Sequence, residues 1–185
     1  MNRIKFSEDW DKLRAPRVYV ASSWRNTIQP EVVRLLRSAG FRVYDFKDPA
    51  NDKGAFKWSD LGIERPEDWP PERCIEFLSH PRAEEGFRQD FDAMLASDAC
   101  VLVLPAGRSA NLEAGWFVGA GRPLVVLKDH GNPDLMYKMA TRVVATVGAI
   151  VPALTEALRY KFGGPLDCGC SSQAAHDRYM DAEMT

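Results

Sequence analysis

The sequence predicts an α/β fold with a doubly wound, mostly parallel five-stranded sheet, and three observations predict it. Short apolar segments rich in β-branched residues alternate with segments of helical periodicity along the chain. Residues 99–104, ACVLVL, are continuously apolar, as expected for a central parallel strand that is covered on both faces. The chain has 185 residues, 45% hydrophobic and 27% charged, which suits one soluble domain.

The first part of the chain predicts a strand, a helix and a second strand. Residues 17–21, RVYVA, and residues 41–46, FRVYDF, are the expected strands, because they are rich in β-branched and aromatic residues. Residues 27–38 between them are the expected helix, with Val32, Val33, Leu35 and Leu36 on its apolar face. Asn26 or Thr27 is suited to cap this helix, and Gly40 to end it.

The rest of the chain continues the alternation of helices and strands. Helices are expected at residues 71–79, 81–97, 110–120, 134–140 and 151–160, and strands at residues 99–104, 123–127 and 142–146. Right-handed crossovers place the loops after the strands along one edge of the sheet. We expect a flavodoxin-like strand order with the first and third strands adjacent, so that residues 22–26 and 105–109 share one crevice.

Two stretches lie outside this pattern. One single α/β domain is expected over residues 1–162, with a Trp- and Pro-containing insertion near residues 47–71 that is either a binding loop or lid, or a surface excursion packed by its own aromatics. Residues 163–185 are expected to be a C-terminal tail. Its Cys168 and Cys170 form a CxC pair with only His176 nearby, which is either part of a metal site or a reduced tail. Because four ligands at a familiar spacing are missing, we expect no metal.

Charge and motifs exclude several classes of function. Lys and Arg number 24 against 26 Asp and Glu, so no strongly basic surface for polymeric nucleic acid is expected, although one phosphate can still find a local basic pocket. No apolar run reaches 18 residues and no signal-peptide pattern opens the chain, so we expect a cytoplasmic protein without membrane contact. The P-loop, GxGxxG, HExxH and GxSxG patterns are all absent, and we expect no cofactor.

The expected crevice brings two carboxylates into consideration. Glu113 falls in the first turn of the helix expected after residues 99–104, where the helix dipole favours a negative charge. It either stabilises the helix end or, being beside the carboxyl end of a strand, serves as an ionised nucleophile. Asp90 and Asp92 on the preceding helix are two residues apart and cannot share a face, so at most one of them faces the crevice.

Two short polar segments each have either a ligand-binding role or an ordinary structural role. Gly107, Arg108 and Ser109 precede a helix, so their backbone N–H groups and side chains form either an anion site or a capping turn with Ser109 as N-cap. Ser23 and Arg25, after the first strand, are either substrate contacts, with Arg25 as a phosphate clamp, or ordinary loop residues.

Three segments carry a family resemblance. Residues 18–25 (VYVASSWR), 90–116 (DFDAMLASDACVLVLPAGRSANLEAGW) and 121–127 (GRPLVVL) resemble the nucleoside 2-deoxyribosyltransferase superfamily, which includes the 2'-deoxynucleoside 5'-phosphate N-hydrolases. The resemblance implies cleavage or exchange of an N-glycosidic bond in a small nucleoside or nucleotide. It also implies a homodimer or larger oligomer, because these families often complete their sites across subunit interfaces.

The resemblance also implies roles for single residues. Glu113 matches the glutamate that attacks the anomeric carbon, Asp90 the aspartate near the sugar or leaving base, and Tyr19 the tyrosine that orients the glutamate. Ser23 and Arg25 match a segment that contacts the nucleotide, and Ser109 lies in the loop that binds a 5'-phosphate in the hydrolases. Trp24, Trp58 and Phe46 are candidates to stack on the base, with core packing as the alternative.

Two other functions stay open. The GRSAN segment that precedes Glu113 is also similar to TIR domains, which use a glutamate to split nicotinamide from NAD. The long insertion and this GRSAN segment depart from the deoxyribosyltransferase pattern, and both departures bear on the identity of the substrate. The second alternative is a module that senses nucleotides or binds a partner without catalysis.

Overall fold

The five strands form one parallel sheet in the order β2-β1-β3-β4-β5. The computed structural model describes residues 15–49, 54–62, 69–128, 131–132 and 134–161. The strands are β1 (Arg17–Ala21), β2 (Arg42–Asp45), β3 (Ala99–Val103), β4 (Leu124–Leu127) and β5 (Arg142–Val144). This order confirms the flavodoxin-like α/β fold, with the first and third strands adjacent.

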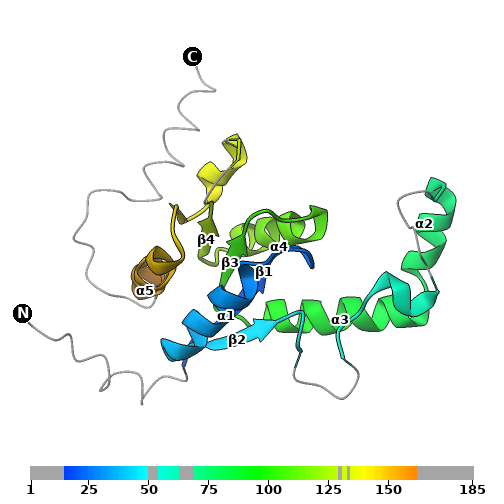
Figure 1. Cartoon of the computed structure of the whole chain (residues 1–185), viewed down its shortest axis with the longest axis horizontal. Helices are drawn as coiled ribbons and strands as arrows, with labels where there is room; N and C mark the ends of the chain where they lie inside the picture. The colour runs from blue at the N-terminus through cyan, green and yellow to red at the C-terminus, as the bar shows by residue number, and fades with distance from the viewer. Residues whose placement is uncertain (1–14, 50–53, 63–68, 129–130, 133, 162–185) are drawn as a thin grey trace, which may run out of the picture.

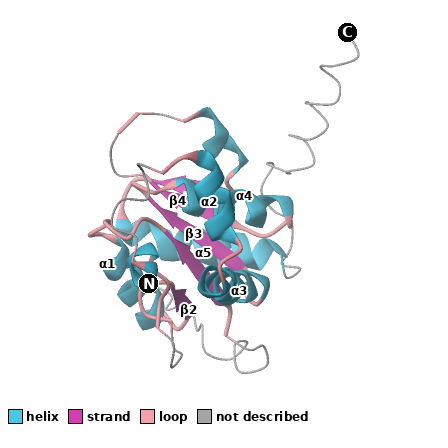
Figure 2. Ribbon diagram, turned by 90° about the vertical axis from the view of Figure 1, so that its right-hand side faces the viewer, coloured by secondary structure: helices cyan, strands magenta, loops and turns pink. Residues whose placement is uncertain are grey.

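Helices cover both faces of the sheet, as Figure 2 shows. On one face, α1 (Gln29–Ser38) and α5 (Ile150–Lys161) enclose an aliphatic core built on Val20, Val101 and Val125. On the other face, α3 (Pro81–Leu95) and α4 (Arg108–Gly119) enclose a core that contains the site's tyrosines. The doubly wound arrangement follows from strands that are apolar on both sides.

The helix α1 begins and ends where residues with special backbone roles stand. The Oδ1 atom of Asn26 accepts the N–H groups of Ile28 at 2.8 Å and Gln29 at 3.0 Å, so Asn26 satisfies two of the free donors at the helix start. Gly40 follows the helix with a φ of 89°, a conformation that favours glycine. The N-cap position itself is Ile28, so Asn26, one of the two capping residues expected, supplies these acceptor bonds from two residues before it.

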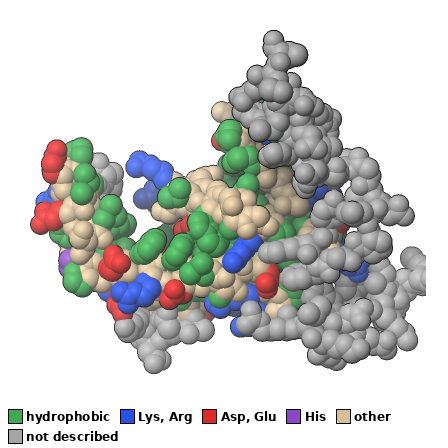
Figure 3. Space-filling view, turned by 180° about the vertical axis from the view of Figure 1, so that it is seen from behind, with side chains coloured by type: hydrophobic (Ala, Val, Ile, Leu, Met, Phe, Trp, Pro, Cys, Tyr) green, Lys and Arg blue, Asp and Glu red, His purple; other side chains and the backbone are tan. Residues whose placement is uncertain are grey.

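A two-helix arm projects from the body of the molecule (Figure 1). It consists of α2 (Pro71–Leu78) and the N-terminal half of α3, and no residue of α2 is buried. Ile75, Leu78 and Phe87 on this arm have exposed fractions of 66%, 62% and 61%. Figure 3 shows hydrophobic and charged side chains interspersed over the arm, seen from behind. The arm therefore exposes apolar side chains that ordinarily pack in a core.

The remaining elements are short. The structure contains 3₁₀ helices η1 (Trp58–Leu61), η3 (Leu135–Met139) and η4 (Val147–Ala149). The helix expected at residues 134–140 is thus a 3₁₀ helix, which Asp134 begins by accepting the N–H of Met136 at 2.9 Å. In the described part of the chain, no helix combines the length and the apolar character needed to cross a membrane.

Metal-ligating side chains do not cluster in the described ranges. Among these residues, no group of three or more His, Cys, Asp and Glu side chains is placed to hold a metal ion. The CxC pair, Cys168 and Cys170, lies outside the described residues, as does the whole expected tail.

Candidate active site

A cavity of about 500 Å³ opens at the carboxyl ends of β1 and β3. This is the point where the strand order reverses, which is where ligands bind in open α/β sheets. Its volume lies within the ordinary range for small-molecule sites. It is lined by Ser22, Trp24, Phe46, Phe56, Lys57, Trp58, Ser59, Asp90, Ser109 and Glu113.

Glu113 reaches the cavity from the second turn of α4, not from the first turn as the sequence predicted. Gly107 is the N-cap in an extended conformation, and the helix begins at Arg108. Because the helix starts two residues earlier than expected, Ser109 lies inside it, and the alternative in which Ser109 is the N-cap is wrong. The dipole acts mainly within the first turn, so it stabilises a charge on Glu113 less than expected.

The electrostatic environment of Glu113 favours its neutral form. Burial, which is the largest cause, and the nearby Asp90 together raise the pKa of the Glu113 carboxyl to about 7, against a hydrogen bond from Tyr19 that lowers it. The ionised nucleophile that the sequence suggested therefore competes, near neutral pH, with a protonated form of the same carboxyl. Glu113 changes charge close to pH 7, where a nucleophile or a proton carrier is useful.

Asp90 is the second carboxyl of the cavity, and it comes from α3. Its Oδ1 atom accepts a hydrogen bond of 2.6 Å from the hydroxyl of Tyr44. Burial raises the pKa of Asp90, and the Tyr44 hydrogen bond lowers it. Asp92 is exposed and absent from the lining, which confirms that at most one aspartate of this pair faces the crevice.

Two stacked tyrosines stand behind the carboxyls. Tyr19 on β1 and Tyr44 on β2 are register partners, and their ring centroids lie 5.3 Å apart with an interplanar angle of 19°. Burial raises the pKa of both phenols, so both hydroxyls stay protonated and able to donate. The sequence pointed to Tyr19 but not to Tyr44. The available signal was the matching position of the two tyrosines in neighbouring strands.

Aromatic side chains form the opposite wall of the cavity. Trp24 and Phe46 make an edge-to-face pair with centroids 5.2 Å apart, and Phe56 and Trp58 make a second at 5.0 Å. The Nζ atom of Lys57 lies 5.1 Å from the centroid of Trp24. Part of the insertion thus lines the cavity, which favours the binding-loop alternative. Phe56 and Lys57 escaped the sequence analysis because this stretch has no periodicity.

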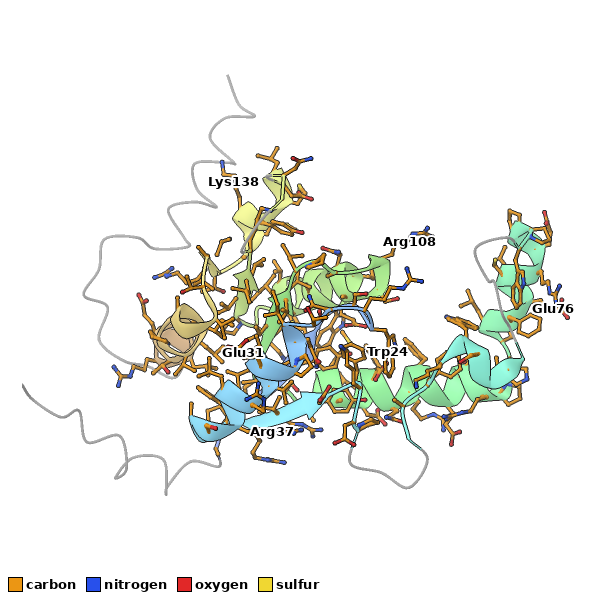
Figure 4. All side chains as sticks on the ribbon, in the orientation of Figure 1. Trp24, Glu31, Arg37, Glu76, Arg108 and Lys138 are labelled. Atoms are coloured by element: carbon orange, nitrogen blue, oxygen red, sulfur yellow. The ribbon has the colours of Figure 1, made fainter. Side chains whose placement is uncertain are left out.

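Four of the predicted binding residues are not among those lining the cavity. Arg108 is exposed and points outward from the start of α4, whereas Trp24 lies between β1 and α3 (Figure 4). Arg25 is also exposed, and its N–H donates to the Ser23 hydroxyl at 3.2 Å. Gly107 is the N-cap residue of α4. In the loop after β1, the serine that lines the cavity is Ser22, one residue before Ser23.

Asn26 and Ser22 tie the two loops of the crevice together. The Nδ2 atom of Asn26 donates to the carbonyl oxygens of Val103 at 3.2 Å and Pro105 at 3.1 Å. The Ser22 hydroxyl also donates to Val103, at 2.8 Å. These bonds join the end of β1 to the end of β3 and fix the spacing between Ser22 and the start of α4.

The arrangement combines the parts needed for substitution at a carbon bearing a leaving group. Glu113 provides a carboxyl that titrates near neutrality, and Asp90 provides a second carboxyl in the same cavity. The aromatic wall suits a flat ring, since bases stack on aromatic side chains.

Comparison with known proteins finds likeness in structure. No family model matches the sequence, and no curated protein matches it. A solved 2-deoxyribosyltransferase from Bacillus psychrosaccharolyticus is similar with a TM-score of 0.50 and 17% identity, over 72% of this chain and 89% of that chain. A solved CMP N-glycosidase from Clostridium botulinum, BcmB, is less similar, with a TM-score of 0.41 and 15% identity over 75% of this chain and 98% of that chain. The chain therefore shares its fold with this 2-deoxyribosyltransferase.

Proposed function

We propose that this protein cleaves or exchanges the N-glycosidic bond of a nucleoside or nucleotide, with Glu113 as the carboxylate nucleophile. The observation that carries the proposal is the placement of Glu113, held by Tyr19, in one aromatic-walled cavity with Asp90. The cavity stands at the switch point of a fold shared with a 2-deoxyribosyltransferase. Fold and site thus support the same class of chemistry.

The proposed reaction uses the two carboxyls in different roles. The Glu113 carboxylate attacks the anomeric carbon while the C–N bond breaks and its electron pair stays with the base, through an oxocarbenium-like transition state. Asp90, in its protonated form, donates a proton to the departing base. Water or a second base then attacks the anomeric carbon and gives its proton to Asp90, which has been ionised in the first step, and the bond to the Glu113 carboxylate breaks. Before Glu113 attacks, its proton passes to Asp90. Asp90 then donates this proton to the departing base.

The remaining lining residues are assigned to binding. Trp24, Phe46 and Trp58 stack on the base, which is worth about 1–3 kcal/mol for each base stacked on an aromatic side chain. Ser22 and Ser109 contact the sugar or a 5'-phosphate. For the half-buried Ser23 and the exposed Arg25, Gly107 and Arg108, which do not line the cavity, we propose contacts with a phosphate at its edge.

The test measures the release of free base from a panel of nucleosides, nucleotides and NAD by chromatography. Glu113→Gln and Glu113→Ala are expected to lower the rate of base release by about 1,000-fold or more while circular dichroism shows an intact fold. Glu76→Gln, at an exposed position of α2, is the matched control and keeps the rate. The proposal fails if the pure, folded protein releases no base from the panel, or if Glu113→Gln keeps the activity.

The same panel separates the two alternative functions. Release of nicotinamide from NAD, with no base from other substrates, identifies a TIR-like NAD hydrolase. The GRSAN segment before Glu113 is the sequence feature that favours this alternative. Tight binding of a nucleotide without any product identifies a non-catalytic nucleotide-sensing module. Both outcomes keep the cavity as the ligand site and change its chemistry.

We further propose that the protein acts as a homodimer or larger oligomer. The exposed apolar side chains of the arm, Ile75, Leu78 and Phe87, support this proposal, because a second copy of the chain would remove them from water. Their burial on association is favourable at about 25 cal/mol per Å² of apolar surface.

A further inference from the structure

The short hydrogen bond between Tyr44 and Asp90 has a defined direction. The Tyr44 hydroxyl donates to the Oδ1 atom of Asp90 at 2.6 Å, a length typical of a hydroxyl bound to a carboxylate. The Nε2 atom of Gln89 donates to the same Tyr44 oxygen at 3.3 Å. Because the oxygen of Tyr44 accepts from Gln89, its single proton is directed to Asp90.

This bond occupies one of the two oxygens of Asp90. Asp90 lines the cavity, so its Oδ2 atom is the one left for a ligand. A hydrogen bond from a hydroxyl to a carboxylate stabilises the ionised form of that carboxylate. Tyr44 therefore orients Asp90 and favours its ionised form, against burial, which is the larger effect and raises the pKa of Asp90.

Each carboxyl of the site thus has its own tyrosine. Tyr19 on β1 bonds to Glu113, and Tyr44 on β2 bonds to Asp90. The two rings stack on each other, so neither tyrosine can swing away independently. The pairs differ because only the Tyr44 oxygen is shown to accept a further hydrogen bond, from Gln89.

We propose that Tyr44, directed by Gln89, is a positioning residue that holds Asp90 as an ionised acceptor and thereby keeps Glu113 protonated in the free protein. Two negative charges in one cavity repel each other, so when Asp90 is ionised Glu113 keeps its proton to higher pH. The nucleophile is then neutral until a substrate arrives and rearranges the hydrogen bonds. The mechanistic part of this inference rests on the proposed function.

Four other titratable or charged groups among the described residues lie near the Tyr44–Asp90 pair. Tyr19 on β1 and Cys100 on β3 contribute a phenol and a thiol whose pKa values burial raises, so both are neutral. Lys57 of the insertion lines the cavity, and the Arg17 guanidinium lies 5.9 Å from the centroid of the Tyr44 ring. The Tyr44 hydroxyl bonds directly to a carboxyl of the pair, and removing it leaves these four groups in place.

The experiment removes only the Tyr44 hydroxyl. Tyr44→Phe keeps the ring that stacks on Tyr19, and carboxyl-carbon NMR of the full chain then follows the titration of Asp90 and Glu113. The pKa of Asp90 is expected to rise by about one unit or more, and the ionisation of Glu113 to move to lower pH. Tyr137→Phe removes a phenol from η3, away from the cavity lining, and is the matched control.

A kinetic readout uses a substrate whose base leaves without a proton. A nucleotide with an N7-methylated purine releases a neutral base, so kcat/KM depends on the ionisation of Glu113 alone. In Tyr44→Phe the rise of kcat/KM with pH is expected to begin at lower pH than in the wild type.

Two results overturn the inference. The first is an unchanged Glu113 titration in Tyr44→Phe, and the second is the same change in Tyr137→Phe. If the wild-type protein turns over no substrate but the NMR shifts occur, the proposed function fails while the role of Tyr44 in placing the proton stands.

Discussion

Glu113 destabilises the folded protein when its carboxyl is ionised. Its folded-state pKa of about 7 lies above its unfolded value of 4.5, so the folded state binds the proton more tightly. The stability that this proton contributes is fully present below pH 4.5 and is lost as pH rises through 7. Near pH 8.5 the loss is about 3 kcal/mol, because one pKa unit corresponds to about 1.4 kcal/mol.

Replacing Glu113 by Gln removes this pH-dependent loss. We expect Glu113→Gln to raise the melting temperature by several degrees at pH 8.5 and by much less at pH 5.5, since glutamine does not ionise. Differential scanning calorimetry at the two pH values measures the effect, with Glu76→Gln as the control. An equal shift at both pH values would show that the carboxyl is not held neutral. The variant predicted to lose activity is thus also predicted to gain stability.

At the scale of elements, the aromatic wall of the cavity packs against α3 where Phe56 meets Gly86. A Cβ atom added to Gly86 would lie 2.7 Å from both Cβ and Cγ of Phe56, closer than real contacts of this kind. Phe56 therefore occupies a notch that exists only because residue 86 has no side chain. Since Phe56 also packs against Trp58, the notch at Gly86 sets the position of the aromatic wall that faces the cavity.

Filling this notch is expected to weaken substrate binding selectively. In Gly86→Ala, Phe56 and Trp58 must shift, so we expect KM to rise about fivefold or more, as the loss of a stacking contact predicts, while kcat changes by less than about twofold. Gly119→Ala, at a helical glycine of α4 with open space around it, is the matched control. Steady-state kinetics with the substrate found in the panel measure the effect, and an unchanged KM contradicts the role of the notch.

The strands were predictable from the sequence because buried strands consist mainly of apolar and β-branched residues, which are visible as short segments in the sequence. The segment RVYVA has the bounds of β1, and the continuous apolar run at residues 99–104 contains β3. The start of α4 was not predictable, because Gly107 is compatible with either a loop or an N-cap and carries no side-chain signal. Because the helix starts two residues earlier than predicted, Glu113 lies in the second turn of α4 and not in the first.

The candidate site was predictable only in part. Glu113, Asp90, Trp24 and Ser109 do reach one cavity, because they follow strands or lie on helices whose faces the periodicity defines. Phe56 and Lys57 lie in an aperiodic stretch whose path depends on the distant Gly86. The partnership of Tyr44 and Asp90 depends on the packing of α3 against β2, which no local pattern encodes.

At the scale of the whole molecule, the arm is the feature that the domain does not use for its own core. Its apolar residues are expected to be covered by a second copy of the chain in the proposed oligomer. The double substitution Ile75→Glu and Leu78→Glu should leave the fold intact, because neither side chain is buried in the single chain. It should convert the oligomer to a monomer, since charges are disfavoured in the centre of an interface.

Light scattering measures the mass of both proteins at the same concentration. Leu135→Glu and Met136→Glu on η3, an exposed apolar site outside the arm, provide the matched control and should leave the mass unchanged. A wild-type protein that is monomeric at working concentration removes the oligomer proposal. An oligomer that survives the arm substitutions places the interface elsewhere.

The strand order has a consequence for how the protein comes into being. β1 pairs with β3 across 81 positions of the chain, and Tyr19 meets Glu113 only after that pairing forms. Pairing over such a separation is slow compared with hairpins or helices, because the intervening chain must first be closed into a loop. A growing chain that ends before α4 therefore already contains both tyrosines and Asp90 but lacks the proposed nucleophile, Glu113. If the proposed function holds, we expect a chain truncated before α4 to release no base from nucleotides.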